Sequence, residues 1–175
     1  MIFGFDVSTS IIGVCVLKDD GTPYEFSYVD LRKKKSLCDK ANAFHDHLYD
    51  WGLHRSHKSK IFIEDKLSGF SGGRTSQQTM MKLAAFNGIA QYIAFKKLQW
   101  VEPIPIHPST VKATMKKDGL IIPRGSDKKK LTLDFVKDVV VDFPYVETRN
   151  GNPQPHCYDM ADAYCVARAG YLKQL

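Results

Sequence analysis

Residues 2–7 read IFGFDV, an apolar run with strong strand character that carries one carboxylate, Asp6, near its end. An ionised carboxylate in a buried strand is costly unless a cation or hydrogen bonds compensate for its lost hydration. The ordinary alternative is an Asp that caps the turn at the end of the strand. The position of Asp6 alone leaves both explanations open.

The runs that follow this strand predict a β-meander. Residues 12–17 form a second apolar run rich in β-branched side chains, joined to the first through residues 8–10, which read STS. A turn signal at Asp20-Gly21 precedes residues 22–30, whose partial alternation is typical of a third strand. We therefore expect the chain to open with three antiparallel strands.

Two more strands are predicted further along the chain. Residues 60–64 read KIFIE, a short buried run that ends in the carboxylate Glu64. Residues 101–106 contain Pro103 and Pro105, which cannot donate a ladder hydrogen bond, so we expect a strand at an edge of the sheet. The sheet should then have five strands.

The spacing of apolar residues predicts helices at residues 37–51, 76–98, 109–115, 127–141 and 158–172. Gly88 lies inside the longest of these and costs about 1 kcal/mol relative to Ala, so we expect it to serve close packing. The order of strands and helices predicts an α/β fold in which one mixed sheet is covered by helices on both faces.

Length, composition and charge narrow the class of protein. The 175 residues fit a single domain spanning 1–175, and 43% hydrophobic residues exclude general disorder. Lys and Arg number 25 against 19 Asp and Glu, a net charge of +6. This excess favours a polyanionic partner, although only weakly.

The cysteines and the start of the chain indicate the compartment. No two cysteines form a CxxC pair, which favours reduced thiols over a zinc site for Cys15, Cys38, Cys157 and Cys165. Residues 1–17 lack the basic region and cleavage site of a signal peptide, and no run of about 18 apolar residues occurs. We expect a cytoplasmic protein without a membrane span, located in the host cytoplasm if the source is viral.

Three further carboxylates favour the explanation that a cation compensates the charge of Asp6. Glu64 repeats the pattern of an acid at the end of an apolar strand, while Asp159 and Asp162 lie three residues apart and share one helix face. A solvent-facing acidic pair near a helix N-terminus is the alternative for the last two. Four carboxylates from three segments repel one another unless hard cations lie among them. Mg²⁺ and Mn²⁺ prefer oxygen ligands, and metal pairs commonly serve in-line phosphodiester cleavage.

These acids and two basic segments together resemble a known family. Asp6 in the first hairpin, Glu64 after the fourth strand and residues 159–163, DMADA, resemble the RuvC-type Holliday-junction resolvases of the RNase H-like superfamily. Residues 108–112, PSTVK, and 126–131, SDKKKL, are similar to the family's two basic segments. The resemblance covers essentially the whole chain, and the ordered set is more specific than any single motif.

The chain also departs from the family pattern. The family usually has Gly two residues after the first Asp, where this chain has Ser8. The loops at residues 117–126 and 146–157 are longer than in typical bacterial relatives. These features are closer to divergent members of viral or phage origin, and they leave the cleavage preference open.

The resemblance implies a structure-selective, Mg²⁺-dependent crossover junction endodeoxyribonuclease that resolves Holliday junctions or branched DNA by paired nicks. It implies two Mg²⁺ ions, with Mn²⁺ as a substitute, that generate hydroxide and stabilise the leaving 3′ oxygen, giving 5′-phosphate and 3′-hydroxyl ends. The ions would be held by Asp6, Glu64, Asp159 and Asp162. Lys112 and one of Lys128, Lys129 and Lys130 would contact phosphate or stabilise developing charge.

Other residues acquire expected roles through the same resemblance. Leu67 and Phe70, in a Gly-rich loop, match the place of an apolar wedge that unstacks bases, and Arg74 would contact the junction backbone. His156 would assist the metal ions or water. The structural alternatives are that Phe70 holds its loop in place and that His156 only begins the last helix.

The helix at residues 76–98 resembles the dimerisation helix of the family. Ala84, Ala85 and Gly88 would let a second copy approach closely, so that two active sites face one four-way junction. A helix buried in the centre of one chain is the alternative.

Three rival functions remain to be distinguished. An RNase H-like nuclease acting on other branched DNA or on ribosomal RNA would carry the same four acids. An actin-like ATPase or sugar kinase also begins with a strand, an Asp and a hairpin, but it needs a Gly-rich phosphate loop and a longer chain. A non-catalytic junction-binding module would have lost the acids that this chain retains.

Overall fold

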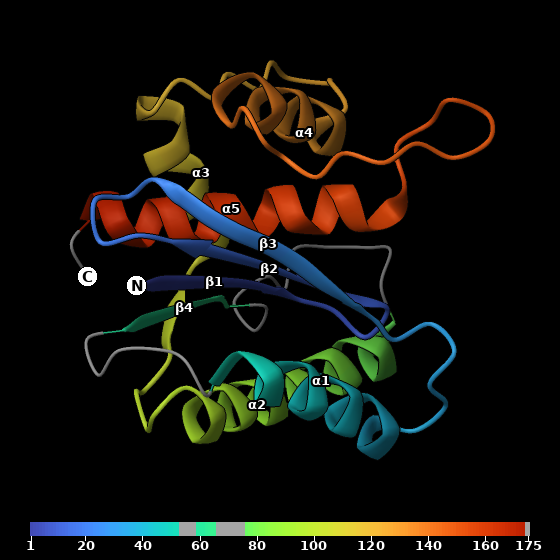
Figure 1. Ribbon diagram of the computed structural model, residues 1–175. Helices are drawn as coiled ribbons and strands as arrows, with labels where there is room; N and C mark the ends of the chain where they lie inside the picture. The colour runs from blue at the N-terminus through green and yellow to red at the C-terminus, as the bar shows by residue number, and fades with distance from the viewer. Residues whose placement is uncertain (53–58, 66–75, 174–175) are drawn as a thin grey trace.

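Five strands form one mixed sheet in the order β3-β2-β1-β4-β5 (Figure 1). The computed structural model describes residues 1–52, 59–65 and 76–173. The strands are β1 (Ile2–Val7), β2 (Ile11–Leu17), β3 (Pro23–Asp30), β4 (Lys60–Glu64) and β5 (Ile104–Ile106). β1, β2 and β3 pair antiparallel, whereas β4 pairs parallel to β1 and to β5. The predicted meander and the predicted edge strand are both confirmed.

Helices cover both faces of this sheet, as the sequence predicted (Figure 1). They are α1 (Leu37–Gly52), α2 (Gln77–Lys97), α3 (Pro108–Lys117), α4 (Lys128–Val139) and α5 (Pro155–Lys173). α5 runs across one face of the sheet with α3 and α4 packed against it, and α1 and α2 lie together on the other face. The arrangement is the expected RNase H-like one, with three antiparallel strands followed by parallel strands.

Two separate apolar cores follow from the alternation of side chains along the strands. Phe3, Phe5 and Val7 of β1 join the core against α1 and α2. Ile2 of the same strand joins the core formed with α3, α4 and α5. The side chain of Asp6 therefore points to the α5 side of the sheet.

α5 packs unusually close to the sheet because small residues line the contact. A Cβ atom added at Gly4 would lie 2.4 Å from the carbonyl oxygen of Ala163 and 2.6 Å from the Cβ of Ala167. Only glycine allows this approach of β1 to the helix backbone. The small residues thereby set a short distance between α5 and strands β1 and β2.

Some sequence-based boundaries are wrong by a few residues. α5 begins at Pro155 rather than at residue 158, because Pro is well suited to the first turn of a helix. α4 ends at Val139 rather than at residue 141, and α3 extends to Lys117. β5 is shorter than residues 101–106. No described helix is both long and apolar enough to cross a membrane.

The packing reason expected for Gly88 is not found within the chain. Gly88 is exposed on α2, and a Cβ atom there would have no neighbour within 4 Å among the described residues. The close packing expected of Gly88 is therefore left to the dimer contact predicted for this helix. None of the four thiols forms a disulfide bond, and three of them, Cys15, Cys157 and Cys165, are buried.

Candidate active site

Asp6 and Glu64 end up on the same face of the sheet, side by side. β1 and β4 pair in parallel with Phe5 opposite Ile63, and one more residue in this register brings Glu64 beside Asp6. Ile61 and Ile63 point to the α1 side, so alternation directs Glu64 toward α5. Asp6 is only 4% exposed, while Glu64 is half-buried. Two acids from separate strands therefore share one sheet edge.

Gly13 brings the third carboxylate to the same place. Gly13 pairs with Asp6 across β1 and β2, and its added Cβ atom would lie 1.9 Å from the carbonyl oxygen of Asp159. The backbone of α5 therefore rests directly on β2 at this residue. Asp159 is 9% exposed, and this contact fixes its backbone over the residue of β2 that pairs with Asp6.

Asp162 lies one turn further along α5, on the Glu64 side of the helix. Burial raises the pKa of the Cys165 thiol well above its usual value, and the nearby charges of Asp162 and Glu64 add to this rise. Asp159 and Asp162 thus lie in the first half of α5, which covers the sheet face to which Asp6 and Glu64 are directed.

Lys129 is the lysine of residues 128–130 that reaches these acids. Its Nζ lies 4.0 Å from Oδ1 of Asp159. α4 begins after Asp127, whose side chain accepts a hydrogen bond from the backbone N–H of Lys130 and caps the helix. Lys128 and Lys130 are exposed, and Lys112 is exposed on α3.

Sequence reasoning missed a cation at the end of β3. Arg32 follows β3 and forms a forked ion pair with Asp30, which lowers the pKa of that carboxyl to about 2. The pKa of the Arg32 guanidinium is raised by Asp30 first and also by the charge of Asp159. Its position two residues after Asp30, on the same side of an extended segment, could have indicated the pairing.

The environment of His156 differs from the expected role at the metal ions. Its ring stacks on Tyr28 of β3, with the ring centroids 3.9 Å apart and the planes at 5°. Burial lowers the pKa of His156, and the positive charge of Arg32 lowers it further. His107 accepts a hydrogen bond from the backbone N–H of Ser109 and caps α3.

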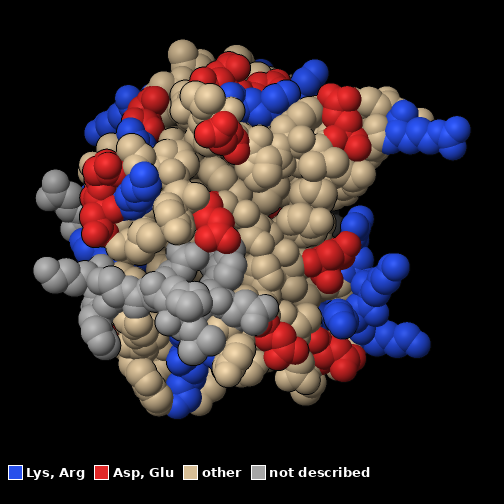
Figure 2. All heavy atoms as spheres, viewed as in Figure 1, with Lys and Arg blue, Asp and Glu red and all other residues tan. Residues whose placement is uncertain are grey.

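The basic residues next to β3 form a distinct surface. Arg32, Lys33, Lys34 and Lys35 occupy the loop between β3 and α1, and Figure 2 shows Lys and Arg gathered where this loop lies in Figure 1. Acidic side chains are interspersed among them. The expected wedge and backbone contacts, Leu67, Phe70 and Arg74, lie outside the described residues.

The four carboxylates fit a hard divalent cation by their chemistry, and all four come from elements that meet at α5. All are oxygen donors, which Mg²⁺ prefers, and the missing side chain at Gly13 lets α5 carry Asp159 up to Asp6. Within residues 1–52, 59–65 and 76–173, however, no three His, Cys, Asp or Glu side chains are already gathered into a metal-binding group. Binding an ion would require these side chains to turn toward one another.

Comparison with known proteins shows where this architecture has been seen before. No protein-family model and no curated protein matches the sequence. The structure resembles Thermus thermophilus RuvC in complex with a Holliday junction substrate, with a TM-score of 0.64 and 16% identity over 99% of this chain and 93% of that one. It also resembles a second Thermus thermophilus RuvC structure, with a TM-score of 0.60 and 16% identity over 99% and 95% of the two chains. The chain therefore has a divergent RuvC-like fold of the RNase H-like class.

Proposed function

We propose that this chain is a single-domain, structure-selective DNA endonuclease that cuts four-way junctions or related branched DNA. The observation that supports the proposal is the contact between Gly13 and the backbone of Asp159, which brings the α5 segment that carries this acid onto the sheet next to the strand of Asp6, within a RuvC-like fold. Buried charges gathered in this way are expensive and are typical of functional sites. The junction substrate of the solved relative supports the choice of branched DNA.

In this proposal the acidic residues of the site bind metal ions and the basic residue binds phosphate. Asp6, Glu64, Asp159 and Asp162 would hold Mg²⁺ or Mn²⁺ through oxygen ligands. Two such ions, when bound, supply an activated water and stabilise the leaving 3′ oxygen. Lys129 would bind a non-bridging phosphate oxygen and stabilise the charge that develops on it. Products would carry 5′-phosphate and 3′-hydroxyl ends.

Lys129 should matter more than its neighbours in the same helical turn. We expect Lys129→Ala to lower single-turnover cleavage about tenfold to a hundredfold, because it removes a cation next to Asp159. Lys128→Ala, an equally exposed lysine, is the matched control and should change the rate little. The rate of nicking of a labelled junction in Mg²⁺ measures both. Equal losses in the two variants would contradict the role assigned to Lys129.

Dimerisation through residues 76–98 is supported by an exposed stripe on α2. Met81, Ala85, Gly88 and Tyr92 recur at helical spacing and are all exposed, with Met81 65% and Tyr92 61% exposed. An apolar helix face of this kind suits a second copy, and the open space at Gly88 allows close approach. Two sites on one dimer would explain paired nicks.

Light scattering tests the dimer. The wild-type chain should give about twice the chain mass at micromolar concentration, and Ala85→Glu should give a monomer because it buries a charge in the interface. Ala113→Glu, the same substitution at an exposed position of α3, should leave the dimer intact. A monomeric wild-type protein would argue against this interface.

A panel of substrates tests the function itself. We expect Mg²⁺-dependent symmetric nicks in a synthetic four-way junction, and slower cleavage of forks, flaps and structured RNA. Preferred cleavage of RNA, or of forks and flaps, would favour the other RNase H-like nucleases. Tight junction binding by the intact chain without any cleavage would favour a non-catalytic module.

A further inference from the structure

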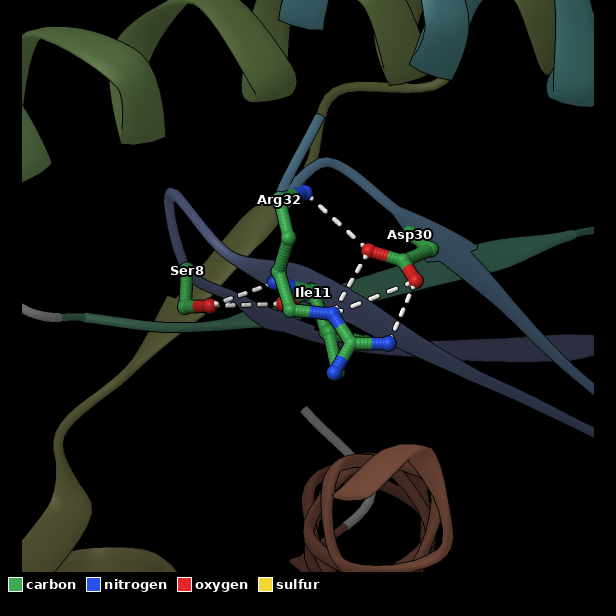
Figure 3. A network of polar contacts seen from close by, with 4 residues as sticks. All are labelled: Ser8, Ile11, Asp30 and Arg32. Carbon is green, nitrogen blue, oxygen red and sulfur yellow. Dashed lines mark hydrogen bonds and ion pairs between the residues drawn. The ribbon is translucent and has the colours of Figure 1, made fainter. Parts of the chain in front are cut away.

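The guanidinium of Arg32 is fixed on one edge only. Its Nε lies 2.9 Å from Oδ1 of Asp30 and its Nη2 lies 2.6 Å from Oδ2, while the backbone N–H of Arg32 donates to Oδ1 at 3.0 Å (Figure 3). Among the described residues none accepts a hydrogen bond from Nη1. The Arg32 side chain is 52% exposed, so this second edge is open to a ligand. An open guanidinium edge suits the bidentate binding of a phosphate group.

The open edge is directed toward the candidate active site. In Figure 3 the guanidinium points from the end of β3 toward the helix below it. The electrostatic effects of Asp159 on Arg32, and of Arg32 on His156, agree with this direction. Arg32 therefore lies on the β3 side of the first turns of α5, close to the site but outside its four carboxylates.

Aromatic side chains lie next to this cation. Tyr28 is paired with Gly13, on the opposite side of Gly13 from Asp6, so it flanks the point where α5 rests on the sheet. His156 stacks on Tyr28, which is 39% exposed. Both rings line a pocket of about 290 Å³ together with Phe26, Val146 and Met160. A mainly apolar pocket of this size, lined by aromatic rings, suits an unstacked base.

Positions along α5 connect this pocket to the carboxylates. His156, Asp159 and Asp162 are spaced three residues apart, so they form a row that crosses the helix from the β3 side to the β4 side. A DNA strand whose phosphate lies among the acids would continue toward Tyr28 and Arg32 on one side. The basic loop residues Lys33, Lys34 and Lys35 extend the positive surface in the same direction.

We propose that Arg32, Tyr28 and His156 form a nucleotide subsite, in which Arg32 binds a phosphate and the aromatic pocket takes a base of the strand to be cut. Asp30 is the positioning residue that holds the guanidinium plane. The inference rests on the proposed function, because it takes DNA as the ligand. In this proposal the end of β3 holds the DNA strand next to the bond that is cleaved.

The two parts of the subsite leave different signatures in metal-free binding. Binding of a labelled four-way junction, measured by fluorescence anisotropy in EDTA over a range of salt concentrations, separates them. Arg32→Gln should weaken binding severalfold and reduce the slope of log affinity against log salt by about 0.7 to 0.9, because one phosphate contact is lost. Tyr28→Leu should weaken binding about fivefold at unchanged slope, since stacking releases no counterions.

Lys18→Gln is the matched control. It removes one exposed positive charge just after β2, at the end of the sheet away from Asp6, and should change neither affinity nor slope. An unchanged slope in Arg32→Gln, or wild-type affinity in Tyr28→Leu, would overturn the subsite. If Tyr28→Leu does not fold, 2-aminopurine scanned along the strand decides the base contact on wild-type protein. One quenched position supports it and none overturns it.

These outcomes are separate from those that test the proposed function. Failure of the wild-type chain to cleave any branched DNA in Mg²⁺ would contradict the nuclease proposal without altering the metal-free binding. Normal cleavage with an unchanged salt slope in Arg32→Gln would contradict the subsite alone.

Discussion

Asp6→Asn is expected to lower Mg²⁺-dependent cleavage of a four-way junction by about a thousandfold or more, while junction binding persists. Asp6 is buried on the sheet face that α5 covers, so the variant removes one charged oxygen ligand of the proposed metal site. Metal ions contribute several kcal/mol of transition-state stabilisation, and each 1.36 kcal/mol is about tenfold in rate. Single-turnover cleavage and equilibrium binding of the same labelled junction measure the two effects.

Two further Asp→Asn variants are compared with Asp6→Asn, one within the proposed site and one away from it. Asp162→Asn should behave like Asp6→Asn, because both residues belong to the same group around α5. Asp46→Asn changes an exposed carboxylate on α1, whose side chain is 79% exposed, and should cleave like the wild type. Asn in place of Asp6 or Asp162 also relieves charge repulsion, so neither variant should unfold more easily. Full activity in either would remove the basis of the metal assignment.

Gly13→Ala is expected to destabilise the fold by about 3 kcal/mol or more and to separate Asp159 from Asp6. The added Cβ atom would lie 1.9 Å from the carbonyl oxygen of Asp159 and 2.3 Å from its carbonyl carbon. Both are backbone atoms of α5, which cannot move aside as a flexible side chain can. Overpacking costs typically about 1 to 3 kcal/mol, and a clash between two backbones lies at the upper end. Urea unfolding measures the loss.

Gly88→Ala provides the control for the same substitution, with both variants unfolded at protein concentrations low enough to keep the chain monomeric, so that the proposed dimer contact at Gly88 plays no part. A Cβ atom at Gly88 meets nothing within 4 Å among the described residues, so higher helix propensity should stabilise the chain by up to about 1 kcal/mol. Opposite signs at the two glycines are the expected pattern. A Gly13→Ala variant as stable as the wild type would show that α5 does not rest on β2 as described.

The strands and the acids could be predicted because their signals are local. The apolar run IFGFDV identifies the strand and shows that the carboxylate of Asp6 is unusual there. The spacing of Asp159 and Asp162 places them on one helix face. The start of α5 was missed because Pro155 follows a run of Asn, Gly and Pro that reads as a loop. Such boundaries depend on how the chain packs rather than on its periodicity.

The remaining parts of the site depend on contacts between distant segments. Adjacent residues of a helix point about 100° apart, so the choice among Lys128, Lys129 and Lys130 requires the position of α4 over α5. Arg32 belonged by sequence to a basic run, and only its closeness to Asp159 separates it from Lys33 to Lys35. Gly13 gave no signal, because its importance comes from a helix almost 150 residues later.

The central claim is that Asp6, Glu64, Asp159 and Asp162 together bind the divalent ions that support DNA cleavage. A crystal of the wild-type chain soaked in Mn²⁺, with anomalous diffraction recorded at the manganese edge, tests it most directly. We expect two anomalous peaks among these four carboxylates, and none among them in a soaked Asp6→Asn crystal. Manganese bound elsewhere, with these four side chains free of metal in a protein that still cleaves junctions, would contradict the claim.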